Sequence, residues 1–243
     1  MSTRKSPLTT NPAFSWTMIP LFAEMDADSL ARIDACAHRH LYQKGAVILA
    51  EGETCSGLHV VLNGLVRIYR LNAEGRLHTL SLLRPPSMFN EVAAVDGGAN
   101  PFNAAAVTDV EVRVVPHAAL RTWMASDPVL LNKAVAALAH LNREYLERLE
   151  DMTFRTIPSR LAKLYLHETM YGDQIAETPS SLTQEDLASI LGTTREVVGR
   201  ALRSLVNAGL LKKVGRTVYI VDRAGLAHLA ETNEIPGIGI VEI

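Results

Sequence analysis

Hydrophobic residues follow a helical period over residues 182–205, in two stretches separated by a glycine. In the first stretch Leu187, Ile190 and Leu191 recur at i, i+3 and i+4, which predicts an amphipathic helix. Thr183 lies just before these residues and is of a type that caps helix N-termini. This first stretch is therefore predicted to form a short helix with one buried face.

The second stretch repeats the pattern after a turn. Gly192 can adopt the positive φ that ends a helix, and Thr194 can cap a second helix two residues later. Val198, Leu202 and Leu205 then share one face of that helix. Two short helices joined by a turn that contains glycine predict a helix-turn-helix.

The outward face of the second predicted helix is polar. It holds three arginines, one carboxylate and one glycine, namely Arg195, Glu196, Gly199, Arg200 and Arg203. Such a face makes a poor core, but it suits a helix that reads base edges in the DNA major groove. Glycine costs about 1 kcal/mol relative to alanine in a helix interior, so we expect the missing side chain at Gly199 to permit a close contact. The simpler alternative is a pair of solvated helices without a ligand.

The segment after these helices predicts a β-wing. Gly209 ends the second helix, and residues 210–220 then favour two short strands that turn at Gly215. Basic residues cluster around this turn, where they can reach DNA phosphates. The complete set of candidate DNA contacts is Thr183, Thr194, Arg195, Glu196, Gly199, Arg200, Arg203, Lys212, Lys213 and Arg216.

Residues 40–116 show a different pattern, with short β-like runs punctuated by glycine. The runs cover residues 46–49, 58–62, 65–70, 77–82 and 110–115. Asn63-Gly64, between the second run and the third, is a strong hairpin signal. Short strands at this spacing predict a sandwich or a small barrel.

A long helical stretch over residues 128–154 separates the two patterns. Its apolar seam, with spacings that alternate between four and three, consists of Leu131, Val135, Leu138, Asn142, Tyr145, Leu149 and Met152. This seam favours a parallel coiled coil with a second copy of the chain, in which Asn142 fixes the register. The alternative is a helix that packs against its own barrel. Phe154–Thr156 would then form a hinge to the helix-turn-helix segment.

Composition adds limits on location and partners. The chain has 243 residues, of which 48% are hydrophobic and 21% charged, as in a soluble globular protein. Its formal net charge is −2, yet residues 181–216 hold six Lys/Arg against three Asp/Glu, a local footprint for DNA. An apolar run near 18 residues and a signal-peptide pattern are both missing, so we expect a cytoplasmic protein without a membrane partner.

The segment Thr194-Arg195-Glu196-Val197-Val198-Gly199-Arg200 resembles the recognition-helix motif Ser/Thr-Arg-Glu-Thr-Val-Gly-Arg of the Crp/Fnr family of bacterial transcription regulators, and differs from it mainly at Val197. The resemblance implies that Arg195, Glu196 and Arg200 read bases in double-stranded DNA. It also implies a homodimer on a two-fold operator, and contact with RNA polymerase where the protein activates. Catalysis is not expected, because a nucleophile–base pair or metal-ligand spacing does not stand out.

The resemblance also gives the fold class and the segments. The expected α+β fold has an N-terminal arm and a jelly-roll sensor barrel of the cyclic-nucleotide-binding type in residues 1–127. A dimerisation helix in residues 128–154 and a winged helix-turn-helix in residues 155–230 follow. Residues 231–243 form an apolar tail that either adds a strand or frays.

The barrel departs from the family pattern where a cyclic phosphate would bind. Family members that bind cyclic nucleotides use a Gly-Glu-Leu turn and an Arg-Ser pair, whereas this chain has Asn90-Glu91-Val92 and Asn100-Pro101. We therefore expect an effector that is not a cyclic nucleotide and is apolar or planar. The candidate pocket residues are Asn90, Glu91, Asn100, Phe102, Asn103, Tyr145 and Leu146. A cyclic-nucleotide-responsive regulator and a constitutive DNA binder without a ligand remain the alternatives.

Cofactor chemistry is only partly constrained by the sequence. Cys36 and Cys55 are the only two cysteines, too few for a four-thiolate iron–sulfur cluster or zinc site, so no metal site is expected. Haem stays open, with His59, His78 and His140 among eight histidines.

Overall fold

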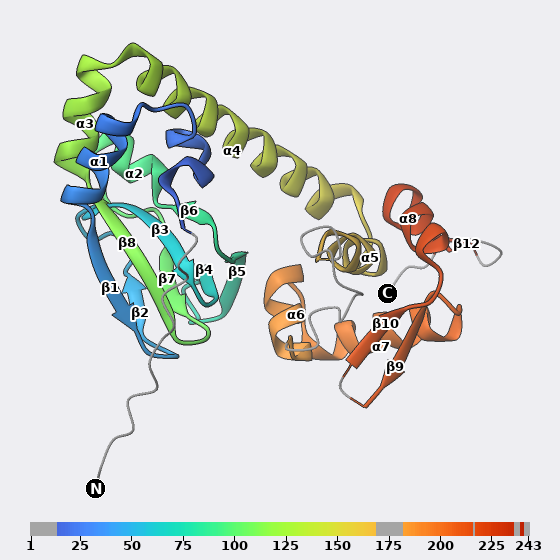
Figure 1. The fold of residues 1–243 in the computed structure, drawn as a ribbon. Coiled ribbons are helices and arrows are strands. Elements are labelled where there is room, and N and C mark those ends of the chain that lie inside the picture. The colour runs from blue at the N-terminus through green and yellow to red at the C-terminus, as the bar shows by residue number, and fades with distance from the viewer. Residues whose placement is uncertain (1–13, 169–181, 216, 236–238, 241–243) are drawn as a thin grey trace, which may run out of the picture. The chain divides into compact units, whose positions relative to one another are not determined.

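The computed structural model describes residues 14–168, 182–215, 217–235 and 239–240 (Figure 1). The chain forms two compact units that divide within one long helix, between Asn142 and Arg143. We describe each unit by itself. None of the helices in these ranges is long and apolar enough to cross a membrane.

The first unit is a barrel of short strands with small helices. Its strands are β1 (His38–Tyr42), β2 (Val47–Leu49), β3 (Gly57–Asn63), β4 (Val66–Leu71), β5 (Leu77–Leu83), β6 (Ser87–Phe89), β7 (Asn103–Ala106) and β8 (Val110–Pro116). Its helices are η1 (Trp16–Met18), η2 (Pro20–Phe22), α1 (Ala27–Cys36), α2 (Glu91–Asp96) and α3 (His117–Ser126). The predicted barrel is confirmed, although η1, η2, α1 and α3 were not foreseen.

Two four-stranded antiparallel sheets build this barrel, with strand orders β1-β8-β3-β6 and β2-β7-β4-β5. Alternation along β3 separates two cores, because successive side chains point to opposite faces. Val61 joins Val112 of β8 and Phe102 in the core of the barrel. Leu58 and Val60 face the other way, into a second core with residues from α1, α2 and α3. Figure 1 shows these helices gathered at one end of the strands.

The long helix α4 (Pro128–Phe154) begins where Asp127 caps it. The Asp127 carboxylate accepts hydrogen bonds from the backbone N–H groups of Val129, at 2.9 Å, and Leu130, at 3.3 Å. Leu130 and Ala134 are buried in the core on the helical side of the barrel. The first turns of α4 therefore pack on the barrel through a face that differs from the predicted seam.

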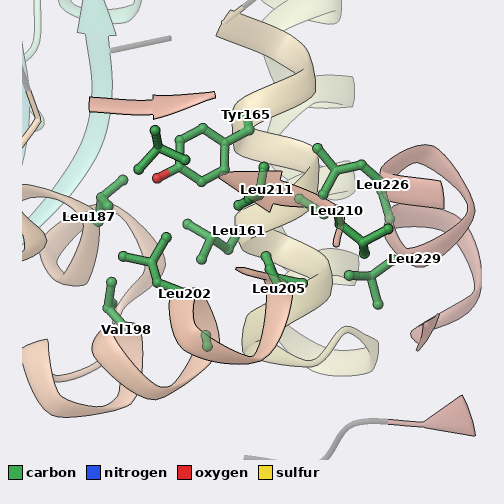
Figure 2. Close-up of a cluster of buried hydrophobic side chains, with 14 of the residues drawn as sticks. Leu161, Tyr165, Leu187, Val198, Leu202, Leu205, Leu210, Leu211, Leu226 and Leu229 are labelled. Carbon is green, nitrogen blue, oxygen red and sulfur yellow. The ribbon is translucent and has the colours of Figure 1, made fainter. Parts of the chain in front are cut away.

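The second unit is a helical domain with a small wing. Its elements are α5 (Ile157–Glu168), α6 (Gln184–Leu191), α7 (Arg195–Asn207), β9 (Leu211–Val214), β10 (Thr217–Ile220), α8 (Arg223–Thr232), β11 (Glu234–Ile235) and β12 (Gly239–Ile240). Figure 2 shows its core, in which side chains from α5, α6, α7 and α8 converge. Tyr165 of α5 lies in this core, and burial raises the pKa of its phenol to about 12.

The tail of the chain forms a hairpin where the structure describes it. Asn233 ends α8 in the left-handed conformation, with φ 65°. Glu234 and Ile235 then pair with Gly239 and Ile240 in antiparallel fashion. Because Ile235 is only 2% exposed in the core of the second unit, this part of the tail adds a strand and does not fray.

Candidate nucleic-acid interface

The first helix of the helix-turn-helix begins at a complete capping box. The Thr183 hydroxyl accepts a hydrogen bond from the Asp186 N–H at 3.2 Å, and the Asp186 carboxylate accepts one from the Thr183 N–H at 2.9 Å. α6 then ends at Gly192, which has φ 64° as predicted. These local signals set the length of α6 and thus the position of the turn to α7.

The second helix is held by one apolar face. The Thr194 hydroxyl accepts a hydrogen bond from the Val197 N–H at 3.4 Å at the start of α7. Val198 and Leu205 are fully buried and Leu202 is 5% exposed, so all three predicted core residues lie in the core. On the opposite face of α7, Arg195, Glu196, Arg200 and Arg203 are exposed, whereas Gly199 between them is buried.

That outward face, together with one residue of α6, forms a shallow hollow. Its lining residues are Gln184, Arg195, Glu196, Gly199, Arg200 and Arg203. The structure thus brings together five predicted DNA contacts and adds Gln184, which the sequence analysis missed. No sequence signal marked Gln184, because its place beside Gly199 comes from the packing of α6 on α7.

Gly199 lies in the middle of this hollow. A methyl group added at Gly199 would lie 3.7 Å from Arg203 Nη1 and 3.9 Å from Gln184 Oε1, which are ordinary van der Waals distances. The fold therefore has room for alanine at this position. Since alanine favours a helix by about 1 kcal/mol over glycine, packing within the described chain does not explain the glycine.

Glu196 is held in its ionised form. A hydrogen bond from its backbone amide, another from the Thr194 side chain and the charges of Arg195 and Arg200 lower the pKa of its carboxyl group. A carboxylate in this state only accepts hydrogen bonds, whereas the guanidinium groups beside it only donate. The face therefore offers both kinds of partner that base edges require.

The wing consists of two short antiparallel strands, as predicted. Val218 pairs with Lys213 and Tyr219 pairs with Lys212 across β9 and β10. Leu211 and Val218 are buried, whereas Lys212 and Lys213 are exposed. Arg216, the third basic residue expected here, lies outside the described residues.

In the barrel, the two asparagines that replace family residues contact each other. Asn90 is fully buried, and its amide Nδ2 donates to Asn100 Oδ1 at 3.0 Å and to the Gly57 carbonyl at 3.3 Å. Asn100 Nδ2 in turn donates to the Ala50 carbonyl at 3.1 Å. We call this pair the amide clasp.

The other candidate pocket residues have structural surroundings of their own. Phe102 is 7% exposed and belongs to the barrel core. Asn103 Oδ1 accepts from the Glu51 N–H at 3.1 Å, and Glu51 forms an ion pair with Arg70. The remaining members are Glu91, half-buried at the start of α2, and Tyr145 and Leu146, exposed by 42% and 58% on α4.

His59 is the candidate haem ligand that lies inside the barrel. Its Nδ1 donates to the Gly57 carbonyl at 3.0 Å, and its ring lies 4.9 Å from that of Phe89 between centroids. Burial is the main cause that lowers its pKa to about 4, so the ring is neutral near pH 7. Cys55 is also buried, and burial raises the pKa of its thiol.

The predicted seam of α4 is exposed in the single chain. Leu131, Val135, Leu149 and Met152 are exposed by 44%, 58%, 61% and 54%. Asn142 and Tyr145 are exposed as well, and Leu138 is half-buried. A row of large apolar side chains along one helix is the kind of surface that a partner covers.

Two family models match the chain. A cyclic nucleotide-binding domain matches residues 39–127, and a Crp-like helix-turn-helix domain matches residues 159–229. The first match covers most of the barrel. The second covers α6, α7 and the wing.

Whole proteins match as well. The CRP-like cAMP-activated global transcriptional regulator of Mycobacterium tuberculosis is 31% identical over 194 residues, which cover 78% of this chain and 86% of that protein. The solved structure of FixK2 from Bradyrhizobium japonicum has a TM-score of 0.71 at 26% identity and covers 79% of this chain and 96% of that one. A Crp/Fnr-family transcriptional regulator of Thermus thermophilus has a TM-score of 0.65 at 28% identity, over 80% and 99% of the two chains.

Proposed function

The chain belongs to the Crp/Fnr family of transcription regulators, and from this membership we propose that it binds a two-fold DNA operator as a homodimer under control of its barrel. The observation that carries the proposal is the outward face of α7. It holds three arginines and one ionised glutamate around the buried Gly199, on a helix whose opposite face packs in the core.

Base recognition is assigned to the first half of α7. Arg195 and Arg200 present donors that match the O6/N7 edge of guanine, and Glu196 can accept from cytosine N4. The DNA phosphates on either side are assigned to Thr183, Thr194, Lys212, Lys213 and Arg216. Gly199 and Arg203 are assigned to the close approach of α7 to the DNA. A single module with this charge binds weakly, which is why the proposal includes two copies.

Dimerisation is assigned to the exposed seam of α4. Its apolar side chains follow coiled-coil spacing, and Asn142 is the one amide among them. A two-fold dimer would place its recognition helices about one helical turn of DNA apart. RNA polymerase is a further partner where the bound protein activates transcription.

The effector is proposed to be apolar or planar and not a cyclic nucleotide. The amide clasp commits Asn90 Nδ2 to Asn100 Oδ1 and the Gly57 carbonyl, and Asn100 Nδ2 to the Ala50 carbonyl; it leaves Asn90 Oδ1 buried without a partner and offers no positive charge for a phosphate. Phe102 fills the adjoining core with an aromatic ring. A haem belongs to this ligand class, and a Soret band in the freshly purified protein would identify it.

Selection from a pool of randomised DNA duplexes tests the proposal. We expect the full-length protein to enrich a two-fold symmetric site with two half-sites about one helical turn apart. Enrichment of one unpaired half-site would contradict the dimer, and recovery of random sequence would contradict base recognition. Adding cyclic AMP in a parallel selection distinguishes the cyclic-nucleotide-responsive alternative, because only that alternative predicts that enrichment depends on it.

A further inference from the structure

The joint between α4 and α5 is tied to the end of α8 by one side chain. Asn233 follows α8 and is 77 residues away in sequence from Thr156, whose N–H donates to Asn233 Oδ1 at 3.0 Å. The same amide donates from Nδ2 to the Phe154 carbonyl at 3.0 Å. Asn233 therefore bonds the backbone on both sides of Arg155.

A second set of contacts holds the same joint. The Ala230 carbonyl, near the end of α8, accepts a hydrogen bond from Ser159 Oγ at 3.2 Å and another from the Arg155 guanidinium. Arg155 Nε also donates to the Asp151 carboxylate at 2.7 Å, and Lys163 Nζ lies 2.6 Å from the second oxygen of that group. The last turn of α4, the joint and the start of α5 are thus bonded to one another and to α8.

These contacts change the expectation for the hinge. The sequence predicts a hinge at Phe154–Thr156, where a free backbone would turn about its φ and ψ angles. In the structure, any such turn must first break the two hydrogen bonds of Asn233, and each bond of this kind contributes about fivefold to an equilibrium constant. The left-handed φ of 65° at Asn233 is what aims its amide at the joint while α8 ends.

We propose that Asn233 is a positioning residue, which locks the α4–α5 joint to the DNA-binding unit so that this unit and the last turn of α4 move as one body. The lock requires neither DNA nor a partner, because the contacts that form it lie within one chain. Its consequence for DNA, a fixed separation of the two recognition helices, rests on the proposed function.

Three substitutions separate loss of the lock from a general loss of stability. Asn233→Gly removes both side-chain bonds but keeps a residue that favours positive φ, so the end of α8 is preserved. Glu231→Ala, at an exposed position in the last turn of α8, is the matched control. Asn233→Asp keeps an acceptor for the Thr156 N–H and loses the donor to Phe154, so an intermediate effect is expected.

Limited digestion with trypsin, without DNA, measures the lock in the full-length protein. Cleavage after Arg155 requires the joint to open, and we expect the rate of appearance of the fragment that begins at Thr156 to rise about 25-fold in Asn233→Gly, about fivefold for each of the two bonds lost. Glu231→Ala is expected to match the wild type. A wild-type rate in Asn233→Gly would overturn the proposal. An equal rise at all cut sites, Arg203 included, would also overturn it, because it would report global unfolding.

A second arm uses the operator found by selection. With a locked joint, one extra base pair between the half-sites weakens binding, and we expect this penalty to shrink in Asn233→Gly while the affinity for a single half-site is unchanged. An unchanged penalty would overturn the positioning role. If the wild type bound no operator, the proposed function would fail, whereas the trypsin result would still decide whether the joint is locked.

Discussion

Asn90 donates a hydrogen bond from Nδ2 to Asn100 Oδ1 at 3.0 Å inside the barrel, and the family resemblance implies that these are the two positions at which members that bind cyclic nucleotides hold the phosphate. Both side chains are buried and neutral. A cyclic phosphate in their place would bury a negative charge without a cation, a costly arrangement.

Weak binding of cyclic AMP is the first prediction. Loss of an arginine–phosphate contact removes about 1.5–3 kcal/mol, which weakens a micromolar site roughly tenfold to a hundredfold. Titration calorimetry on the full-length protein measures this directly. A dissociation constant below about ten micromolar, coupled to tighter operator binding, would contradict the account and favour the cyclic-nucleotide-responsive alternative.

The second prediction concerns Gly199→Ala. The added methyl group meets only ordinary contacts, and alanine is favoured in a helix by about 1 kcal/mol, so the free energy of unfolding is expected to rise. Affinity for the operator is expected to fall, because the proposed function places Gly199 where α7 approaches the DNA most closely. Thermal melting and fluorescence anisotropy measure the two effects. A variant that is more stable and binds with unchanged affinity would show that Gly199 does not lie against DNA.

Dimerisation through α4 gives the third prediction. Replacing Leu138 and Leu149 with glutamate puts charge into the proposed seam, so sedimentation is expected to detect monomers and operator binding to be lost. Val129→Glu, at a position that is exposed by 57% on α4 but outside the seam, is the control and should stay dimeric. Wild-type protein that is monomeric at about tens of micromolar would refute the seam as an interface.

The fourth prediction uses the buried histidine. His59 has a pKa of about 4 in the folded chain, against 6.5 for an ordinary histidine, so the unfolded chain binds a proton first as pH falls. Stability is then fully present above about pH 6.5 and declines toward pH 4, by about 3 kcal/mol in total. Urea unfolding across this range measures the decline, and His59→Gln should flatten it while His140→Gln should not. Equal slopes in all three proteins would contradict the assignment.

Local patterns explain why the helix-turn-helix was predicted almost residue by residue. Thr183, Gly192 and Thr194 act within one turn of their own positions, so neighbouring residues are sufficient to identify them. Five barrel strands, β2, β3, β4, β5 and β8, were found for the same reason, because alternation and turn residues are local, whereas β1, β6 and β7 were not predicted. The helices η1, η2, α1 and α3 were missed, since they form by packing on the sheet and lack strong signals of their own.

The features that sequence patterns did not indicate are long-range. Gln184 lies beside Gly199 only because α6 packs on α7, and Asn233 reaches Thr156 across 77 residues. The amide clasp is similar, because the family resemblance implies that Asn90 and Asn100 stand at the phosphate site but does not indicate that they bond to each other. Spacing along a chain carries no information on such pairs until the fold is known.

The central claim is that α7 reads the bases of the operator. The most direct test compares the affinities of matched variants for the selected operator and for a random DNA duplex. We expect Arg195→Ala and Arg200→Ala each to lose about 1–3 kcal/mol on the operator, with relaxed base preference and little change on random DNA. Lys213→Ala should instead weaken both duplexes alike and reduce the salt dependence, and Arg121→Ala, on α3 of the barrel, should change neither. If the two α7 variants bound the operator as the wild type does, α7 would not be the helix that reads DNA.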